Sequence, residues 1–88
     1  MVATEPRRRF IVRDPRVHGG EPVIQGTRVP VRSIILSLRD DYPGDPSAVA
    51  EAYRVSLAAV EGALDFYHAH RAEIERIAEQ HDRAAHGR

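Results

Sequence analysis

The alternation of apolar and polar positions divides the chain into a short extended part and a longer helical part. Two apolar runs, at residues 10–13 and 22–24, flank a turn that contains one histidine and two glycines. A third extended piece is expected over residues 27–30. Because proline cannot donate a hydrogen bond to a β-ladder, Pro22 and Pro30 require these strands to be short, at a sheet edge, or paired with a second copy of the chain.

After this extended part the apolar positions follow the helical period. The spacing i, i+3, i+4 and i+7 is occupied by Val31, Ile34, Ile35 and Leu38. This stripe predicts an amphipathic helix over residues 31–40, which the turn sequence Tyr42-Pro43-Gly44 ends. A second helix is expected over residues 46–54, because Asp45 is a favourable N-cap residue and Pro46 suits the first helical position.

A third helix is expected over residues 57–82, with Ser56 as its N-cap, because no proline interrupts the pattern. Such a helix would be roughly 40 Å long, so its distal half should project beyond a body of two short helices. There the apolar stripe narrows to a seam flanked by acidic residues, which favours docking of a partner or of a second copy over a solvated, fraying tail. The residues expected to bind the partner are His70, Glu73, Ile74, Ile77 and Glu79.

The connection between the second and third helices is about three residues long and suits a helix-turn-helix. The sequence thus predicts a mainly α fold, with short N-terminal β-strands before the helices and a long C-terminal helix at the end. One domain is expected over residues 10–82. We expect a flexible basic arm at residues 1–9 and a disordered tail at residues 83–88.

The net charge of zero hides an uneven distribution. Residues 1–40 carry eight arginines and four acidic residues, a formal charge of +4, whereas residues 41–88 carry five arginines and nine acidic residues, a formal charge of −4. The basic half is suited to nucleic-acid phosphates, or to the acidic half of a second copy. The residues expected to contact DNA are Arg7, Arg8, Arg9, Arg13, Arg28 and Arg32. The exposed side of the third helix is a poorer DNA surface, because it carries Glu61 and Asp65.

Residue types and spacing argue against several kinds of chemistry. The chain has no cysteine, so disulfides and thiolate metal sites are excluded. His68 and His70 are two positions apart, which places them on different faces of a helix, whereas a metal pair needs i, i+3 or i, i+4 spacing. No catalytic motif is present, and we expect no enzymatic activity, no metal and no cofactor. No apolar run approaches the roughly 20 residues of a membrane span, and Met1–Arg9 lacks the core of a signal peptide, so a cytoplasmic protein is expected.

The sequence from His18 to Val31, HGGEPVIQGTRVPV, closely resembles the signature of the bacterial family known as domain of unknown function 433. The likeness continues through the following amphipathic helix and covers about residues 10–76. It extends over the apolar pattern of Leu57, Val60, Ala63, Leu64 and Tyr67. The resemblance implies a homeodomain-like three-helix core with a helix-turn-helix. It also implies an antitoxin encoded beside a toxin with a PIN-like ribonuclease fold.

Physical roles can be proposed for residues of this signature. Gly19 and Gly20 can adopt the positive φ of a tight turn, and Gly26 allows a bulge or the close approach of another backbone. Alternation points Arg28 away from its neighbours, so it can reach a phosphate, a carboxylate of a second protomer, or water. The chain departs from its relatives where Asp40–Pro46 replaces a glycine-containing turn, and we expect a reshaped loop there.

Two expectations of function follow. The first is the antitoxin of a type II toxin–antitoxin pair, which neutralises a PIN-like ribonuclease by protein–protein binding and autoregulates its operon. The second is a free-standing dimeric helix-turn-helix transcriptional regulator that binds operator DNA and has no toxin partner. In both cases a homodimer is expected, formed at least partly by the short strands.

Overall fold

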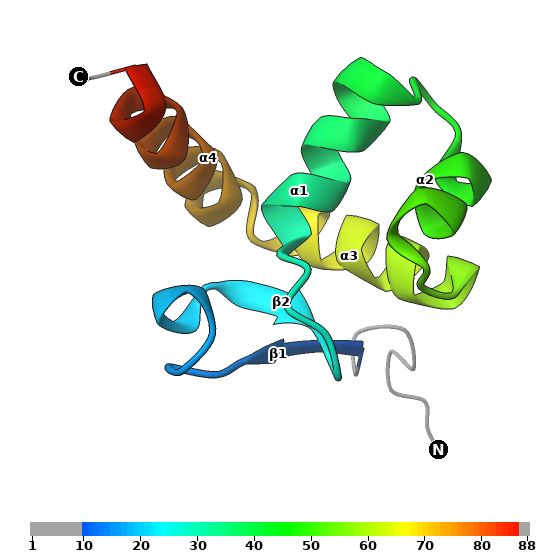
Figure 1. The fold of residues 1–88 in the computed structure, drawn as a ribbon, viewed down its shortest axis with the longest axis horizontal. Coiled ribbons are helices and arrows are strands. Elements are labelled where there is room, and N and C mark those ends of the chain that lie inside the picture. The colour runs from blue at the N-terminus through cyan, green and yellow to red at the C-terminus, as the bar shows by residue number, and fades with distance from the viewer. Residues whose placement is uncertain (1–9, 87–88) are drawn as a thin grey trace.

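The computed structural model describes residues 10–86 of the chain, and their side chains as far as Asp82. The elements are β1 (Ile11–Arg13), β2 (Pro22–Ile24), α1 (Val31–Leu36), α2 (Pro46–Tyr53), α3 (Leu57–Ala69) and α4 (Arg71–His86). Figure 1 shows α2 and α4 on opposite sides of α1, with the strands below. The protein is mainly helical, with a short two-stranded sheet at its N-terminal end. Within residues 10–86, no helix is both long enough and apolar enough to cross a membrane.

The two strands pair in antiparallel fashion, and the expected third strand over residues 27–30 is wrong. The paired residues are Ile11 with Ile24, Val12 with Val23, and Arg13 with Pro22. Thr27 forms a turn instead: its hydroxyl donates to the Ile24 carbonyl oxygen at 2.8 Å and accepts from the Val29 amide at 3.0 Å. This segment touches β2 through one bridge, at Pro30, whose missing amide prevents a longer ladder.

The turns around β2 depend on glycine conformation. Gly20 and Gly26 adopt φ values of +92° and +80°, in the left-handed region that disfavours other residues. A Cβ added at Gly26 would meet no described atom within 4 Å. The positive φ of the turn therefore explains the glycine at this position, whereas no backbone of the described residues approaches it closely.

Helix α1 continues beyond Leu36 into a π-helical turn at Ser37–Asp41. The Ser37 hydroxyl lies 2.8 Å from the Tyr53 hydroxyl of α2, which joins the end of α1 to α2. Gly44, with a φ of +67°, then turns the chain toward the start of α2. The loop that departs from the family pattern is thus organised by a helical turn rather than by a simple tight turn.

The predicted caps of the second and third helices are confirmed. The Asp45 carboxylate accepts a hydrogen bond from the Ala48 amide at 3.1 Å, and the Ser56 hydroxyl accepts one from the Ala59 amide at 3.0 Å. Between these helices Arg54 adopts a left-handed conformation, with a φ of 59°, and so ends α2 without a glycine. The connection from α2 to α3 therefore remains short.

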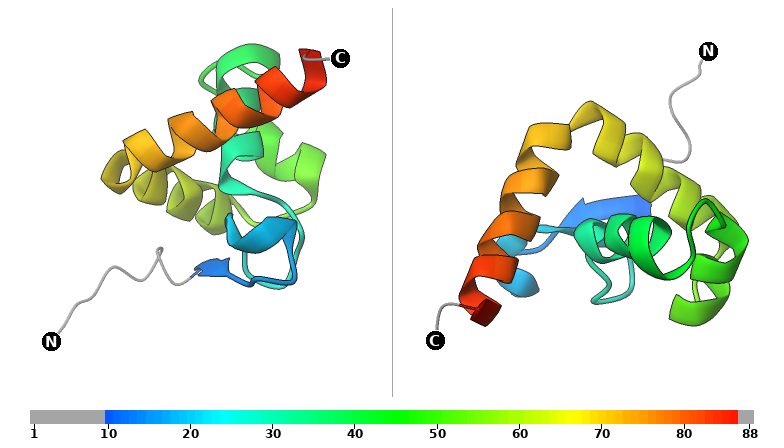
Figure 2. Two further views of the ribbon diagram at one scale, coloured as in Figure 1. Left: turned by 90° about the vertical axis from the view of Figure 1, so that its left-hand side faces the viewer. Right: turned by 90° about the horizontal axis from the view of Figure 1, so that it is seen from above.

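The expected continuous helix over residues 57–82 is wrong. The chain breaks at His70, with a φ of −130° and a ψ of 40°, and α4 leaves α3 at a corner (Figure 2). The His70 amide donates to the Phe66 carbonyl oxygen at 2.9 Å, and the two rings stack with centroids 4.1 Å apart. Helix α4 therefore folds back to contact α1, and it does not project as expected.

One hydrophobic core explains this change of direction. Its buried members are Ile24, Val31, Ile34, Ile35, Val49, Ala50, Ala59, Val60, Ala63, Tyr67 and Ile74. Three residues of the predicted stripe, Val31, Ile34 and Ile35, are included, while Leu38 is partly buried against the core. Ile74 of α4 is included as well and is only 2% exposed. Burying an isoleucine side chain contributes about 1.5–3 kcal/mol, a gain that a projecting helix would forgo.

Candidate protein-binding groove

Helix α4 is held against the body by one apolar anchor and by polar contacts with several other elements. The anchor is Ile74 in the core. The polar partners are Arg13 of β1, Glu21 directly before β2, and Arg39 in the turn after α1. Together these contacts determine which face of α4 is turned outward.

Arg13 and Glu73 form a two-pronged ion pair between β1 and α4. Arg13 Nη1 lies 2.5 Å from Glu73 Oε2, and Arg13 Nη2 donates to Glu73 Oε1 at 2.9 Å. These hydrogen bonds lower the pKa of the Glu73 carboxyl and raise the pKa of the Arg13 guanidinium. The guanidinium also lies 5.4 Å from the centre of the Phe66 ring, which fixes its position further.

A second, more buried charge cluster lies at the start of β2. The Glu21 side chain is only 7% exposed, and Arg32 Nε of α1 lies 3.0 Å from its Oε2. His81 Nε2 of α4 lies 3.3 Å from Glu21 Oε1. A buried carboxylate is costly unless it is paired, so Arg32 compensates the burial of Glu21. The cluster links the turn before β2 to both α1 and α4.

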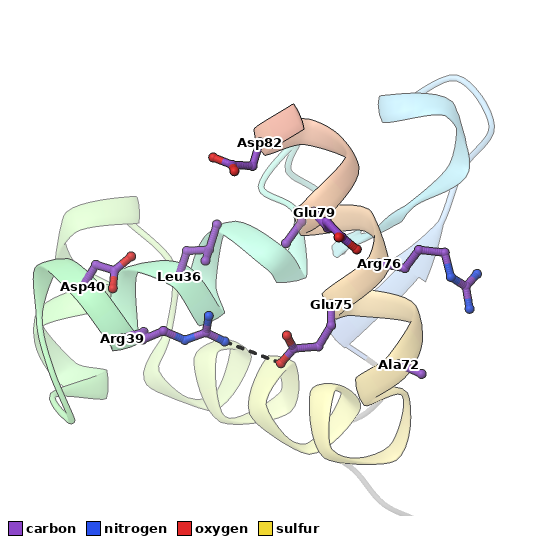
Figure 3. Close-up of a pocket in the computed structure, with 9 residues that line it drawn as sticks. Leu36, Arg39, Asp40, Ala72, Glu75, Arg76, Glu79 and Asp82 are labelled. Atoms are coloured by element: carbon purple, nitrogen blue, oxygen red, sulfur yellow. Dashed lines mark ion pairs between the residues drawn. The ribbon is translucent and has the colours of Figure 1, made fainter. Parts of the chain in front are cut away.

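Glu75 connects the outer side of α4 to the turn after α1 and to α3. The Tyr67 hydroxyl donates to Glu75 Oε2, and Arg39 Nη2 lies 3.6 Å from the same oxygen. Figure 3 shows the Arg39 side chain reaching across toward Glu75. These side chains form one end of a groove between α1 and α4.

The groove has a volume of about 690 Å³ (Figure 3). Its lining residues are Leu36, Arg39, Asp40, Ala72, Glu75, Arg76, Ala78, Glu79 and Asp82. Four of these are acidic and two are arginines, which gives the groove a formal charge of −2. Such a lining attracts a basic segment electrostatically. Within the described residues, no three His, Cys, Asp or Glu side chains are grouped as a metal site would require.

The structure separates the five residues that were expected to bind a partner. Glu79 lines the groove, whereas Ile77 faces a smaller hollow beside the turn before β2. Ile74 lies in the core, so the expected exposed seam is wrong at this position. Glu73 is partly exposed and is held in an ion pair with Arg13. His70 marks the break between the helices. The physical reason is the return of α4 onto α1, which turns the seam inward.

The arginines that were expected to contact DNA also lie in different surroundings. Arg7–Arg9 lie outside the described residues. Arg13 and Arg32 are engaged in ion pairs with glutamates of the same chain. Arg28 is exposed on the turn after β2, where its carbonyl oxygen lies 2.9 Å from Nε2 of His18. The basic character of the first forty residues is thus partly neutralised within the fold.

Sequence reasoning missed most of the groove. Glu75, Glu79 and Asp82 fall at i, i+4 and i+7, so their common helix face was visible in the sequence. The opposite wall, with Arg39 and Asp40, comes from a segment more than thirty residues earlier. No local pattern joins the two walls, because they meet only when α4 folds back.

Comparison with known proteins identifies the family. No curated protein and no solved structure matches the chain. The sequence model of the family described as protein of unknown function (DUF433) matches residues 11–67, more than half of the chain. The match includes the signature from His18 to Val31 and ends before α4. The resemblance seen in the sequence is therefore confirmed, and the protein belongs to the DUF433 family.

Proposed function

We propose that this protein is the antitoxin of a toxin–antitoxin pair, and that it neutralises a PIN-like ribonuclease by binding a basic segment of that enzyme in the groove between α1 and α4. The observation that carries the proposal is the net negative charge of the groove lining. The α4 wall carries three acidic residues and Arg76, whereas the opposite wall carries Asp40 beside Arg39. A nuclease surface that faces RNA is basic, because it must attract phosphates. An acidic groove competes with RNA for such a surface.

The internal ion pairs support the same proposal. Arg13 and Arg32 are paired with Glu73 and Glu21, which reduces the basic character of the described surface. The groove acids lie at exposed positions, where they can steer a basic partner. Complementary charge of this kind raises the association rate and the specificity of protein binding.

Under the proposal, a PIN-like ribonuclease is encoded beside the gene of this chain, and the test uses that enzyme. A variant with Asp40→Lys and Glu79→Lys reverses one charge on each wall of the groove. We expect its affinity for the nuclease to fall on the order of a hundredfold, and its protection of RNA in a cleavage assay to be lost. Affinity is measured by titration calorimetry with both proteins purified.

The matched control is Glu51→Lys, at an exposed position of α2 away from the groove, which makes the same charge change as either single groove substitution. This control should bind and protect as the unmodified protein does. Undiminished binding by the groove variant would contradict the assignment of the groove. A neighbouring nuclease that forms no complex with the unmodified chain would contradict the antitoxin function itself.

A second candidate function is DNA binding through a homeodomain-like helix-turn-helix. It is favoured by one observation: α2 and α3 are in contact, and only a three-residue connection separates them. That arrangement is typical of helix-turn-helix proteins, in which the second helix enters the major groove. Glu61 and Asp65 on α3 weigh against it, because they repel phosphates.

DNA binding is tested separately, by fluorescence anisotropy with a duplex from the region upstream of this gene. If the second candidate is right, the affinity for the duplex falls steeply as the salt concentration rises. Arg28→Ala then weakens binding to the duplex at a given salt concentration. The groove variant should not lose DNA binding, because its added positive charges do not repel phosphates. No binding above that of an unrelated duplex would exclude sequence-specific recognition.

A further inference from the structure

The break between α3 and α4 has no cause in the local sequence. Neither glycine nor proline occurs from Leu64 to His86. Ala69 and Arg71, on either side of the break at His70, are strong helix formers. The local sequence therefore favours one continuous helix, and the packing of α4 on its own chain opposes that preference.

The break also leaves the first backbone amides of α4 outside the helical hydrogen-bond ladders. The α3 hydrogen-bond ladder ends with the His70 amide donating to Phe66, and the α4 ladder starts with the Ile74 amide donating to the His70 carbonyl oxygen at 3.1 Å. The amides of residues 71–73 lie between these two bonds. In a continuous helix each of them would have an acceptor four residues earlier. Straightening the chain at His70 thus adds three backbone hydrogen bonds.

The contacts that hold α4 closed do not involve the hinge itself. They are made to the core and to Arg13, Glu21, Arg39 and Tyr67, which lie on other elements. A second copy of the chain presents the same surface, residue for residue. A second copy therefore offers α4 the same ion-pair partners and the same core as its own chain does.

We propose that two copies of the protein exchange their α4 helices. In the exchanged dimer, residues 57–86 form one helix in each chain, about 45 Å long, and each α4 lies on the body of the other chain. Glu73 then pairs with the partner's Arg13. In this dimer the contacts of α4 are conserved and the amides at the hinge gain acceptors. The opposing cost is the association of two chains, so the fraction of dimer rises with protein concentration.

Exchange changes how the candidate groove is built. One wall, with Arg39 and Asp40, comes from one chain, and the other wall, with Glu75 and Glu79, comes from its partner. Each dimer then carries two grooves, and neither is complete without both chains. The inference does not rest on the proposed function, because it concerns only how the chain pairs with itself.

Complementary charge variants test the exchange. Arg13→Glu alone places two carboxylates against each other in a closed chain, and Glu73→Arg alone places two guanidinium groups against each other. When the two variants are unfolded together and refolded as a mixture, exchange between unlike chains pairs opposite charges at both contacts. One chain carries an isotope label, so that native mass spectrometry separates mixed dimers from self-dimers.

Random pairing of equal amounts gives as many mixed dimers as self-dimers. We expect the ratio of mixed dimers to self-dimers to rise above that on the order of tenfold, because like-charge contacts are strongly unfavourable in the self-dimers. Mixed dimers at the random share would show that copies pair through another surface, and a mixture that stays monomeric would show no exchange; either result overturns the proposal. The single-chain variant with Arg13→Glu and Glu73→Arg restores opposite charges within one chain, and it establishes that the two substitutions are compatible with folding.

Hinge variants provide an independent measurement. His70→Ala favours the continuous helix, whereas His70→Gly favours the break, and each dimer contains two hinges. The dissociation constant of the His70→Ala dimer, measured by sedimentation equilibrium, should be on the order of tenfold lower than that of the His70→Gly dimer. Equal constants for the two variants would contradict an exchange at this hinge.

Discussion

At the scale of single residues, ion pairs decide what the charged side chains of this protein can do. Arg13 is paired with Glu73, sixty positions later in the chain, and Arg32 with Glu21, eleven positions earlier. Both arginines were expected to face DNA. The structure uses their charge to hold strands and helices together, so composition alone overstates the basic surface of the first forty residues.

The pair of Arg13 and Glu73 predicts a dependence of stability on pH. The pKa of Glu73 is lowered below its ordinary value of 4.5 in the folded protein, chiefly by hydrogen bonds from Arg13. The stabilisation is therefore fully present above pH 4.5, and it is lost as the pH falls through the lower folded pKa. Both side chains remain partly exposed, so the effect is about 0.5–1 kcal/mol.

Urea denaturation from pH 7 to pH 3 checks this dependence. Glu73→Gln should lower the free energy of unfolding at neutral pH and flatten its decline at acid pH. Glu51→Gln, on the exposed side of α2, is the matched control and should retain the full decline. If the free energy of unfolding of Glu73→Gln declines at acid pH as steeply as that of the unmodified protein, this ion pair is not a source of stability.

The buried carboxylate of Glu21 predicts a larger effect. Arg32→Met removes its main counter-charge and should reduce the free energy of unfolding by about 2–3 kcal/mol. Adding Glu21→Gln should recover part of this loss, because the neutral amide is less costly to bury. Thermal unfolding monitored by circular dichroism measures both variants. Arg28→Met, at an exposed position, should change stability by less than about 0.5 kcal/mol, and an equal loss in both arginine variants would contradict the interpretation.

At the scale of secondary-structure elements, α4 shows how packing overrides local preference. Its sequence continues the helix of α3, yet Ile74 belongs to the core, and reaching it requires a corner at His70. The amphipathic pattern of α4 was recognised in the sequence, but its apolar side was assigned to a partner. The same pattern is satisfied by α1 of the chain itself, or, under the proposed exchange, by α1 of a second copy.

The position of Ile74 predicts a contrast with its neighbour on the same helix. Ile74→Ala should destabilise the protein by about 2–4 kcal/mol, because it leaves a cavity in the core. Ile77→Ala, at a partly buried position, should cost less than about 1 kcal/mol. Urea denaturation followed by circular dichroism measures both. Equal losses would indicate that α4 does not dock through Ile74.

At the scale of the whole molecule, the groove and the exchange are linked by the same helix. The groove exists only where α4 lies against α1, so the chain that supplies α4 also supplies three of the four acidic residues of the lining. In an exchanged dimer, the proposed toxin complex contains two antitoxin chains and two toxins. A closed monomer would instead bind one toxin per chain.

Mass action gives a prediction for the intact protein. If folding is coupled to pairing of two chains, the midpoint of thermal unfolding rises with protein concentration. Scanning calorimetry over a hundredfold range of concentration should show this rise, and the rise should be smaller in His70→Gly. A midpoint independent of concentration in the unmodified chain would indicate a monomer.

The local features of this protein could be predicted from its sequence, because they depend on residues close together in the chain. The stripe of α1, the caps at Asp45 and Ser56, and the family signature were all recognisable in this way. The expected third strand failed because side-chain hydrogen bonds of Thr27 compete with the ladder, a choice that apolar pattern does not encode.

The direction of α4, and everything that follows from it, depends on tertiary packing. The corner at His70, the burial of Ile74, the neutralisation of Arg13 and the two walls of the groove all join segments that are far apart in the sequence. The physical reason is that burial of apolar surface is a property of the whole chain. A core that closes over α4 gains more than the hydrogen bonds lost at the break.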